Sequence, residues 1–303
     1  MTNLSKSLSA QISMHGCVAT IDLGCLAHNL GEIRKATNNK QIIGVVKANA
    51  YGHGIVEVSR CLEQNGVNTL AVARISEAML IREAGIGAEI LVLGNVVGDF
   101  ALWAANNNVT VTLSSKSQLD SLIQGLKVGA TSQKLKVHLK LNTGMNRLGA
   151  LREEFFDILV QAINSRELSI VGAYTHLVDG ANKNLTEKQI QDAKDVFEAI
   201  EIRSKLITHI LSSDGIMGKY VDTSDAVRPG LALYGVSTFP GTSLKPVMGL
   251  TSQVIKLNNV AKGEGTGYGP QWRAAVDTRL ATISIGYGDG ILRSLANRGE
   301  VVI

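Results

Sequence analysis

The feature that most constrains the fold is the alternation, between residues 42 and 236, of short apolar runs with segments of helical periodicity. Strands that alternate with helices form parallel sheets, and eight of them fit a closed (β/α)8 barrel better than an open sheet. The helical segments include Ile55–Asn65, Ser76–Ala84, Lys116–Leu126, Glu153–Ile163 and Glu187–Ile202. The apolar runs have the length of buried strands and occur at Ile42–Lys47, Thr69–Ala73, Ile90–Leu93, Val109–Leu113, Leu135–Leu141, Ser169–Thr175, Ile207–Leu211 and Leu231–Val236.

The segments before and after this alternation have a different composition. Residues 1–13 form a polar tail, and Cys17–Ile21 is predicted to be a short strand before a helix that Asp22 caps. After Val236, proline- and glycine-rich turns separate short β-type runs at Leu250–Leu257, Thr278–Ile285 and from Val301 onward. We expect a barrel over residues 14–236 and a mostly β, incomplete domain over residues 237–303. Strand 17–21 is expected to pair with the second domain.

Composition and charge exclude several functional classes. The 303 residues suffice for a large core, and 30 basic against 26 acidic residues give a net charge of +4. The basic residues form no cluster, so nucleic acid is not an expected partner. Cys17, Cys25 and Cys61 have neither metal-ligand spacing nor a paired framework, which favours a reducing compartment. Without an apolar leader or a membrane-length apolar run, we expect a cytoplasmic protein.

The first chemical feature is a lysine at the end of a buried strand, within the run Ile42–Gly54. An ammonium group in an apolar site loses its proton more readily and becomes a nucleophile towards carbonyl groups. Tyr51 follows on a loop that Gly52 and Gly54 keep open, where its hydroxyl could contact a phosphate. Taken alone, Lys47 is better interpreted as a side chain that extends from the strand end to water.

Further polar clusters follow the predicted barrel strands, which is where barrel enzymes place their chemistry. Arg147 lies in a glycine-flanked loop, and its guanidinium suits a carboxylate. His176 ends the sixth predicted strand, and the hydroxyls of Ser212 and Ser213 follow the seventh, a region that favours phosphate. Each of these residues alone has an ordinary interpretation, such as a solvated arginine, a structural histidine or a helix cap.

Four strings occur in an order that resembles the alanine racemase family, which depends on pyridoxal 5'-phosphate (PLP). They are V-V-K-A-N-A-Y-G-H-G at residues 45–54, G-M-x-R-L-G at 144–149, R-P-G-x-x-L-Y-G at 228–235 and G-Y-x-D-G at 286–290. The resemblance extends from Cys17 to Ile303. It implies a (β/α)8 barrel followed by a β domain, and an enzyme that interconverts L- and D-alanine.

The resemblance also implies how the cofactor is held. Lys47 would carry PLP and His176 would lie near its ring, while the phosphate would contact Tyr51, Ser213, Gly230 and Leu231. Arg228 would face the pyridine nitrogen. Because an arginine stays protonated, the ring nitrogen that it contacts stays unprotonated, and the ring is a weaker electron sink. Such a sink favours simple removal and return of a proton, which is racemisation.

Racemisation needs a base on one face of Cα and an acid on the other. In the family these are the lysine and a tyrosine from the other subunit, so Lys47 and Tyr287 are the expected pair in a homodimer with shared sites. Arg147 would bind the substrate. In many members the residue equivalent to Lys140 is carbamylated and orients this arginine. The family's role in bacteria implies a supply of D-alanine for peptidoglycan.

The sequence departs from the family pattern at three places. Ser212 replaces the usual Asn, and residues 177–180 do not reproduce the usual stretch after His176. Family members also continue beyond Ile303, with segments that close the partner's pocket, so the chain is expected to be truncated at its C-terminus. The alternatives are a non-catalytic PLP-binding protein involved in cofactor handling, or a racemase of broader specificity. A decarboxylase is disfavoured by Arg228.

Overall fold

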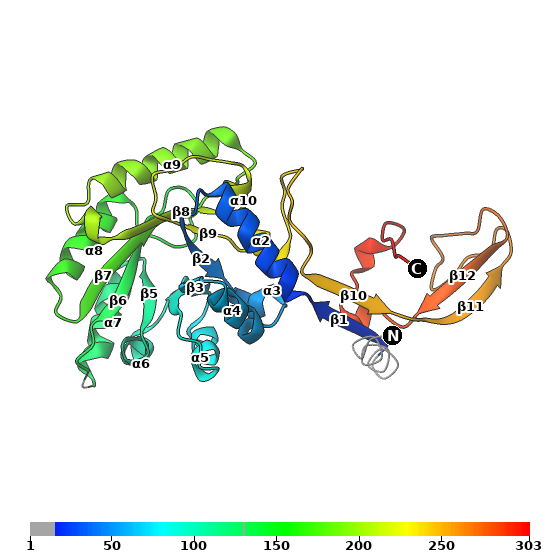
Figure 1. Cartoon of the computed structure of the whole chain (residues 1–303), viewed down its shortest axis with the longest axis horizontal. Helices are drawn as coiled ribbons and strands as arrows, with labels where there is room; N and C mark the ends of the chain where they lie inside the picture. The colour runs from blue at the N-terminus through cyan, green and yellow to red at the C-terminus, as the bar shows by residue number, and fades with distance from the viewer. Residues whose placement is uncertain (1–15, 130) are drawn as a thin grey trace. The chain divides into compact units, whose positions relative to one another are not determined.

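The computed structural model describes residues 16–129 and 131–303. The predicted tail, residues 1–13, lies outside the described residues. The chain divides into two compact units, one of residues 22–247 and one in which residues 16–21 join residues 248–303 (Figure 1).

The larger unit is a closed barrel of eight parallel strands, in which β9 pairs with β2 to complete the ring (Figure 1). Together with the β strands of the smaller unit, this confirms the predicted fold class of a (β/α)8 barrel followed by a mostly β domain. The barrel strands are β2 (Gln41–Val45), β3 (Thr69–Val72), β4 (Glu89–Val92), β5 (Val109–Leu113), β6 (Leu135–Lys140), β7 (Leu168–Tyr174), β8 (Ile207–Ser212) and β9 (Ala226–Arg228).

Helices surround the strands. Asp22 caps the first of them as predicted, because its Oδ1 accepts a hydrogen bond from the amide of Cys25 at 2.9 Å. The helices are α2 (Leu23–Ala36), α3 (Lys47–Tyr51), α4 (Ile55–Gln64), α5 (Ile75–Glu83), α6 (Ala101–Asn106), α7 (Lys116–Lys127), α8 (Arg152–Asn164), α9 (Lys183–Glu198) and α10 (Ser213–Met217). Short 3-10 turns lie at η1 (Gly98–Phe100), η2 (Arg203–Lys205) and η3 (Leu231–Tyr234).

The eighth predicted strand, Leu231–Val236, is wrong. The closing strand is Ala226–Arg228, and Leu231–Tyr234 forms a 3-10 turn that ends at Gly235, whose φ is +87°. A short apolar run does not distinguish a strand from a buried helical turn, and the side chains of Ala232, Leu233 and Tyr234 are buried as part of this turn. The correction moves Arg228 to the carboxyl end of a strand.

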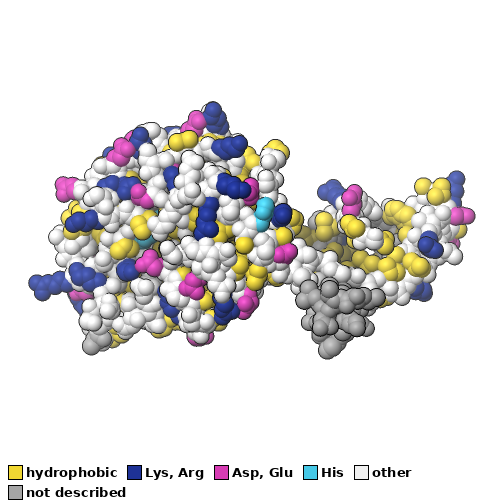
Figure 2. Space-filling model, viewed as in Figure 1, with side chains coloured by type: hydrophobic (Ala, Val, Ile, Leu, Met, Phe, Trp, Pro, Cys, Tyr) yellow, Lys and Arg dark blue, Asp and Glu magenta, His cyan; other side chains and the backbone are white. Residues whose placement is uncertain are grey.

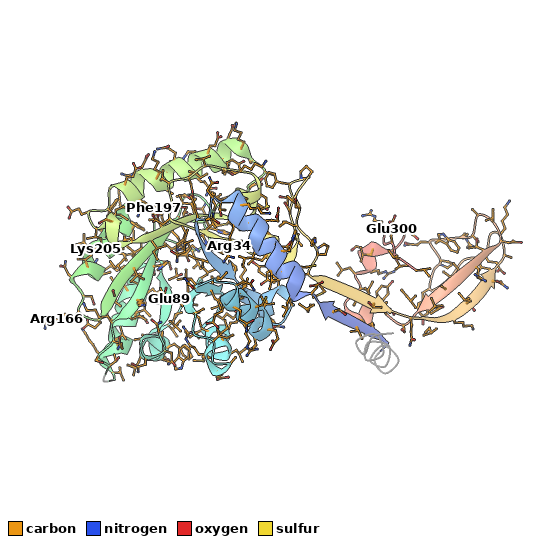
Figure 3. The ribbon with its side chains drawn as sticks, in the orientation of Figure 1. Arg34, Glu89, Arg166, Phe197, Lys205 and Glu300 are labelled. Atoms are coloured by element: carbon orange, nitrogen blue, oxygen red, sulfur yellow. The ribbon has the colours of Figure 1, made fainter. Side chains whose placement is uncertain are left out.

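Apolar residues fill the barrel and the layer between strands and helices. Ile43, Val45, Ala71, Leu91 and Ala226 form a cluster inside the barrel. In the outer layer Phe197 of α9 is 3% exposed and its ring centroid lies 6.5 Å from that of Phe155 of α8 (Figure 3). Burial of a side chain of this size contributes roughly 1.5–3 kcal/mol to stability. Apolar packing inside and around the barrel therefore holds the strand ends in place.

The smaller unit consists of antiparallel strands. β1 (Cys17–Ile21) pairs with β10 (Met248–Ser252), and β11 (Val254–Val260) pairs with β12 (Thr278–Ile283). The single run predicted at Leu250–Leu257 is therefore divided at Gln253 between two sheets. The strand predicted from Val301 onward is absent, because residues 301–303 have no neighbouring strand to supply ladder hydrogen bonds.

The surface of the barrel unit carries charges of both signs that are interspersed on the visible face (Figure 2). In the smaller unit many apolar side chains are exposed, including Leu250, Ile255 and Leu257. Among the described helices, none combines the length and the apolar character that crossing a bilayer would require.

Candidate active site

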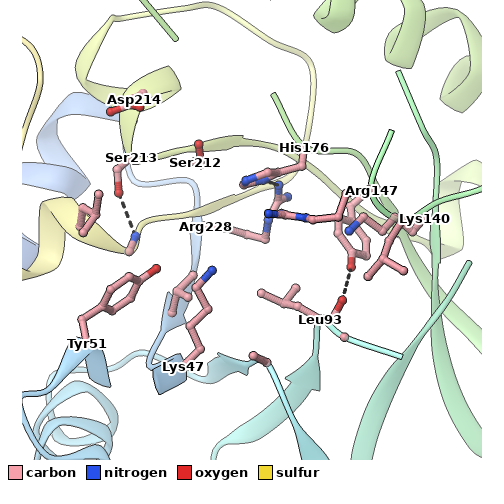
Figure 4. Close-up of a pocket in the computed structure, with 17 residues that line it drawn as sticks. Lys47, Tyr51, Leu93, Lys140, Arg147, His176, Ser212, Ser213, Asp214 and Arg228 are labelled. Carbon is pink, nitrogen blue, oxygen red and sulfur yellow. Dashed lines mark hydrogen bonds between the residues drawn. The ribbon is translucent and has the colours of Figure 1, made fainter. Parts of the chain in front are cut away.

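A cavity of about 510 Å³ opens at the carboxyl ends of the barrel strands (Figure 4). Every predicted site residue of the barrel lines it: Lys47, Tyr51, Lys140, Arg147, His176, Ser213, Arg228, Gly230 and Leu231. These residues come from five separate strand ends, so the fold brings together what the sequence keeps apart. Asp214 is the one acidic side chain among the lining residues, against four basic ones other than histidine.

Lys47 lies two residues beyond the end of β2 and opens an unusual turn. The next four residues, 48–51, have φ values between 53° and 54°, which is the left-handed region. For residues with a side chain this conformation costs roughly 1–2 kcal/mol each, and it persists only where its surroundings hold it. Glu77 of α5 supplies part of that support, because its Oε1 accepts the amide of Ala48 at 2.6 Å.

The electrostatics of the cavity favour a reactive amine at Lys47. Partial burial lowers the pKa of this ammonium, and the nearby charge of Arg147 lowers it further, while the carboxylate of Glu77 acts in the opposite direction. The Nζ atom lies 5.8 Å from the centroid of the Tyr51 ring. The side chain is half-buried and has no hydrogen-bond partner among the described residues.

A set of hydrogen-bond donors surrounds one end of the cavity. Ser213 Oγ accepts the amides of Gly230 and Ala232 at 2.9 and 3.1 Å, which leaves its own O–H free to donate. A Cβ atom at position 230 would lie 2.6 Å from the hydroxyl oxygen of Tyr51, so only glycine leaves room for that hydroxyl. The amide of Leu231, at the start of η3, has no protein acceptor in the described part of the chain. These donors suit a phosphate.

Arg228 lies at the centre of the barrel and is 3% exposed. Its Nη1 donates to Nδ1 of His209 at 2.6 Å, and its Nη2 donates to the carbonyl of Thr175 at 2.6 Å and to Nδ1 of His176 at 3.3 Å. Burial lowers its pKa to about 10, so the guanidinium stays charged at neutral pH. Its Nε–H has no partner among the described residues.

Three residues at this site were missed by the sequence analysis: His138, His209 and Tyr174. Because Arg228 donates to Nδ1 of His209, the hydrogen of that ring is on Nε2, which donates to Nδ1 of His138 at 2.8 Å. Burial and the charge of Arg228 lower the pKa of His138 to about 3 and that of His209 well below its usual value. Polar residues in an otherwise apolar strand were the signal that could have identified them.

Lys140 and Arg147 occupy the opposite side of the cavity. Lys140 is 5% exposed, and its Nζ forms neither a hydrogen bond nor an ion pair with any described residue. Burial lowers its pKa to about 8, and the charges of Arg228, Arg147 and Lys47 act in the same direction. Its Nζ and the guanidinium of Arg228 lie 5.3 and 5.0 Å from the centroid of the Tyr174 ring. The ring thus offers both cations a weak electrostatic partner.

Tyr287, the remaining predicted site residue, belongs to the smaller unit. It begins the 3-10 turn η4 (Tyr287–Asp289), which the bond from the amide of Gly286 to Asp289 Oδ2 closes at 2.9 Å. Its side chain is 69% exposed. The glycines on both sides of Tyr287 leave the phenol free of neighbours along the chain.

Comparison with known proteins agrees with the barrel, the β unit and the cavity. Family models described as the alanine racemase N-terminal and C-terminal domains match residues 21–238 and 247–303. The alanine racemase of Methanococcus maripaludis is 37% identical over 306 residues, which cover 95% of this chain and 80% of that protein.

Solved structures show the same relationship. The alanine racemase of a D-cycloserine-producing Streptomyces lavendulae has a TM-score of 0.85 at 28% identity, over 93% of this chain and 77% of that one. A histidine racemase of Leuconostoc mesenteroides has a TM-score of 0.79 at 27% identity, over 91% and 76%. Both domain models match, and the relatives share most of their length with this chain. The chain belongs to the alanine racemase family of enzymes.

Proposed function

We propose that the chain is a PLP-dependent racemase that interconverts L- and D-alanine. The observation that supports this most directly is the pairing, in one cavity, of an amine of lowered pKa with a buried arginine that stays charged. Lys47 would act as the base and Arg228 as the partner of the cofactor ring. The family to which the chain belongs supports the same reaction.

The residues of the cavity fit this cofactor. The free O–H of Ser213, the free amide of Leu231 and the hydroxyl of Tyr51, for which Gly230 leaves room, would hold the phosphate. The unpartnered Nε–H of Arg228 would donate to the pyridine nitrogen. When bound, PLP would supply the electron sink that acidifies the Cα–H of an amino acid.

Arg228 sets the strength of that sink. As a permanent donor, it would give the ring nitrogen a hydrogen bond but no proton. Its place is fixed by three acceptors on two segments, the carbonyl of Thr175 and Nδ1 of His176 directly after β7, and Nδ1 of His209 in β8. This arrangement restrains the reaction to removal and return of one proton.

We further propose that the second acid/base is Tyr287 of the partner subunit, which makes the active form a homodimer with shared sites. Support comes from the exposure of Tyr287 on a glycine-flanked turn and from the family resemblance. Lys47 would exchange the proton on one face of Cα and the phenol on the other. Substrate enters with a carboxylate, and Arg147 is the cation of the cavity rim that would bind it.

Lys140 is proposed to be carbamylated. A buried lysine without an acidic partner and with a pKa of about 8 is partly neutral in mildly alkaline solution, and the neutral amine is the form that adds carbon dioxide. The product would place a negative charge beside Arg147 and Arg228. We also propose the family's bacterial role, supply of D-alanine for peptidoglycan in the cytoplasm.

A second candidate is a racemase that accepts larger amino acids. The similarity to a solved histidine racemase favours it, because the same fold is present in a protein named for that substrate. A non-catalytic PLP-binding protein is the third reading, and it would bind cofactor at Lys47 without turnover.

One experiment tests these readings together. The purified chain is incubated with PLP, reduced with borohydride and digested, and the modified lysine is identified by mass. A second portion of the PLP-loaded protein, which is neither reduced nor digested, is assayed with L-alanine and L-histidine in deuterated water, where racemisation introduces deuterium at Cα. We expect label at Lys47 and exchange of alanine; label without exchange of any amino acid would favour the non-catalytic reading, and scattered label would reject the site.

A further inference from the structure

A buried glutamine of helix α9 joins two loops that carry proposed site residues. Gln189 is 1% exposed, and its Oε1 accepts the amide of Val178 at 2.9 Å. Its Nε2 donates to Oγ1 of Thr143 at 3.1 Å and to the carbonyl of His176 at 3.4 Å. Because an amide N–H can only donate, the oxygen of Gln189 must face Val178, which fixes the nitrogen on the side of Thr143 and His176.

This orientation gives direction to a chain of hydroxyl groups. Thr175 Oγ1 donates its only hydrogen to the carbonyl of Leu141 at 2.9 Å. In the 2.8 Å contact between the hydroxyls of Thr143 and Thr175, the donor is therefore Thr143. The oxygen of Thr143 in turn accepts from Gln189. One directed chain thus runs from α9 through Thr143 and Thr175 to Leu141, across the ends of β7 and β6.

The residues in this chain of hydrogen bonds lie next to proposed site residues. Thr143 begins the loop that carries Arg147. Thr175 and His176 supply acceptors for Arg228, since Nη2 donates to the carbonyl of Thr175 at 2.6 Å and to Nδ1 of His176 at 3.3 Å. Gln189 itself does not line the cavity, so any effect on the reaction must act through these neighbours.

We propose that Gln189 is a positioning residue, which holds the Arg147 loop and the Thr175–His176 segment in one arrangement through this directed chain. Its kinetic consequence rests on the proposed racemase function. Its structural consequence, local protection of two segments, does not. Hydrogen exchange measures the structural consequence, and racemisation kinetics measure the kinetic one.

Two substitutions break the chain in different ways. In Gln189→Glu a carboxylate oxygen replaces the donor, so Thr143 must turn its hydrogen towards the carboxylate and the two threonine oxygens face each other without a hydrogen. Thr143→Val removes the middle link and keeps the shape, whereas Thr143→Ser keeps the link. Gln191→Glu is the matched control, because it makes the same change on the exposed side of α9, where Nε2 of Gln191 contacts Asp195.

The first readout is hydrogen exchange by mass spectrometry, with and without PLP. In Gln189→Glu and Thr143→Val we expect exchange of residues 142–149 and 175–178 to rise about tenfold or more, while the rest of the barrel is unchanged. The second readout is alanine racemisation, in which kcat/KM is expected to fall about 10–100-fold, mainly through KM, because the loop of Arg147 is misplaced. Thr143→Ser and Gln191→Glu should stay within about threefold of the parent.

Several results would overturn the proposal. If residues 142–149 and 175–178 exchange equally fast in Thr143→Val and Thr143→Ser, the hydroxyl of residue 143 does not position these two segments. A uniform rise of exchange over the barrel would assign Gln189 a general structural role. If Gln189→Glu does not fold, the valine and serine variants decide alone. If the unsubstituted protein racemises no amino acid, the proposed function fails. Hydrogen exchange of residues 142–149 and 175–178 still decides whether the hydrogen bonds through Thr143 and Thr175 position the two loops.

Discussion

The guanidinium of Arg228 donates a hydrogen bond to Nδ1 of His209 at 2.6 Å, and both side chains are buried at the centre of the barrel. The Tyr174 ring stacks on His209 with centroids 4.7 Å apart, and His138 accepts from the other ring nitrogen. A guanidinium enclosed in this way is held by neutral partners and by no carboxylate among its hydrogen-bond acceptors. Its orientation therefore depends on the imidazole directly.

Replacement of His209 by Leu removes that acceptor and the bond to His138. A hydrogen bond to a charged group contributes about 1.5–3 kcal/mol, so kcat/KM for alanine is expected to fall about 10–100-fold as Arg228 loses its alignment. Circular dichroism at a single wavelength measures the rate. His28→Gln is the control, because the one side-chain hydrogen bond of His28 to a described residue is with the carbonyl of Ser243. A His209→Leu enzyme within twofold of the parent would contradict the prediction.

Stability should decrease in mild acid because of two buried histidines, His138 and His209, and the partly buried His176. Burial lowers the pKa of His138 and His176 to about 3 and that of His209 well below 6.5. Between pH 6.5 and about 3 the unfolded chain binds protons that the folded chain does not, so the stabilisation is complete above pH 6.5 and is lost as the pH falls.

The expected slope is up to about 1.4 kcal/mol per pH unit for each such histidine. Urea unfolding of the PLP-free chain at pH 7.0, 6.0 and 5.0 measures it. His176→Gln should reduce the slope by about one histidine's share. A free energy of unfolding that is constant over this range would contradict the assignment of neutral histidines.

Glu77 is expected to control both the shape and the pKa of the lysine turn. Its carboxylate accepts the amides of Ala48, Ala73 and Arg74 at 2.6, 2.8 and 3.1 Å, and its charge raises the pKa of Lys47. In Glu77→Gln the side-chain amide nitrogen faces backbone donors and the charge is gone. The pKa of Lys47 should therefore fall further below its usual value.

Competitive acetylation of the PLP-free chain as a function of pH, read by mass at Lys47, measures this change. Glu83→Gln, an exposed change at the end of the same helix, is the control. An unchanged or raised pKa in Glu77→Gln would show that the carboxylate does not act on Lys47.

Gly230→Ala tests the phosphate end of the cavity. The added Cβ would lie 2.6 Å from the hydroxyl oxygen of Tyr51, which must move away. Loss of one hydrogen bond to a charged phosphate group corresponds to about 10–100-fold weaker PLP binding. Titration of PLP followed by fluorescence gives the affinity. Gly31→Ala in α2, where a Cβ meets no atom within 4 Å, should bind PLP as the parent does; equal affinities for both variants would argue against the cradle.

The repeated units of the barrel could be predicted because periodicity and strand length are local properties. Seven of the eight barrel strands were located by their apolar runs, and only β9 was misplaced. Ala226–Arg228 is three residues long and ends in a charge, so its pairing with Gln41 and Ile42 depends on ring closure and not on its own pattern.

The site residues with a motif could be named from the sequence, whereas those that support them could not. Lys47, Arg147 and Arg228 occur in recognisable strings. Gln189 and Glu77 lie in ordinary helical segments, and their roles arise from contacts across 46 and 29 residues of sequence. A hydrogen bond at such separation leaves no trace in local composition, so only coordinates reveal it.

Closure of the ring has a consequence for how the protein matures. Lys47 follows β2 and Arg228 ends β9, and these two strands pair with each other although the chain between them spans almost the whole barrel. During synthesis the cavity cannot form until residue 228 has been made and β9 has paired with β2, the first strand of the barrel. If PLP is the cofactor as proposed, a nascent or prematurely stopped chain would offer it Lys47 without Arg228, so the complete binding site would form only after the barrel closes.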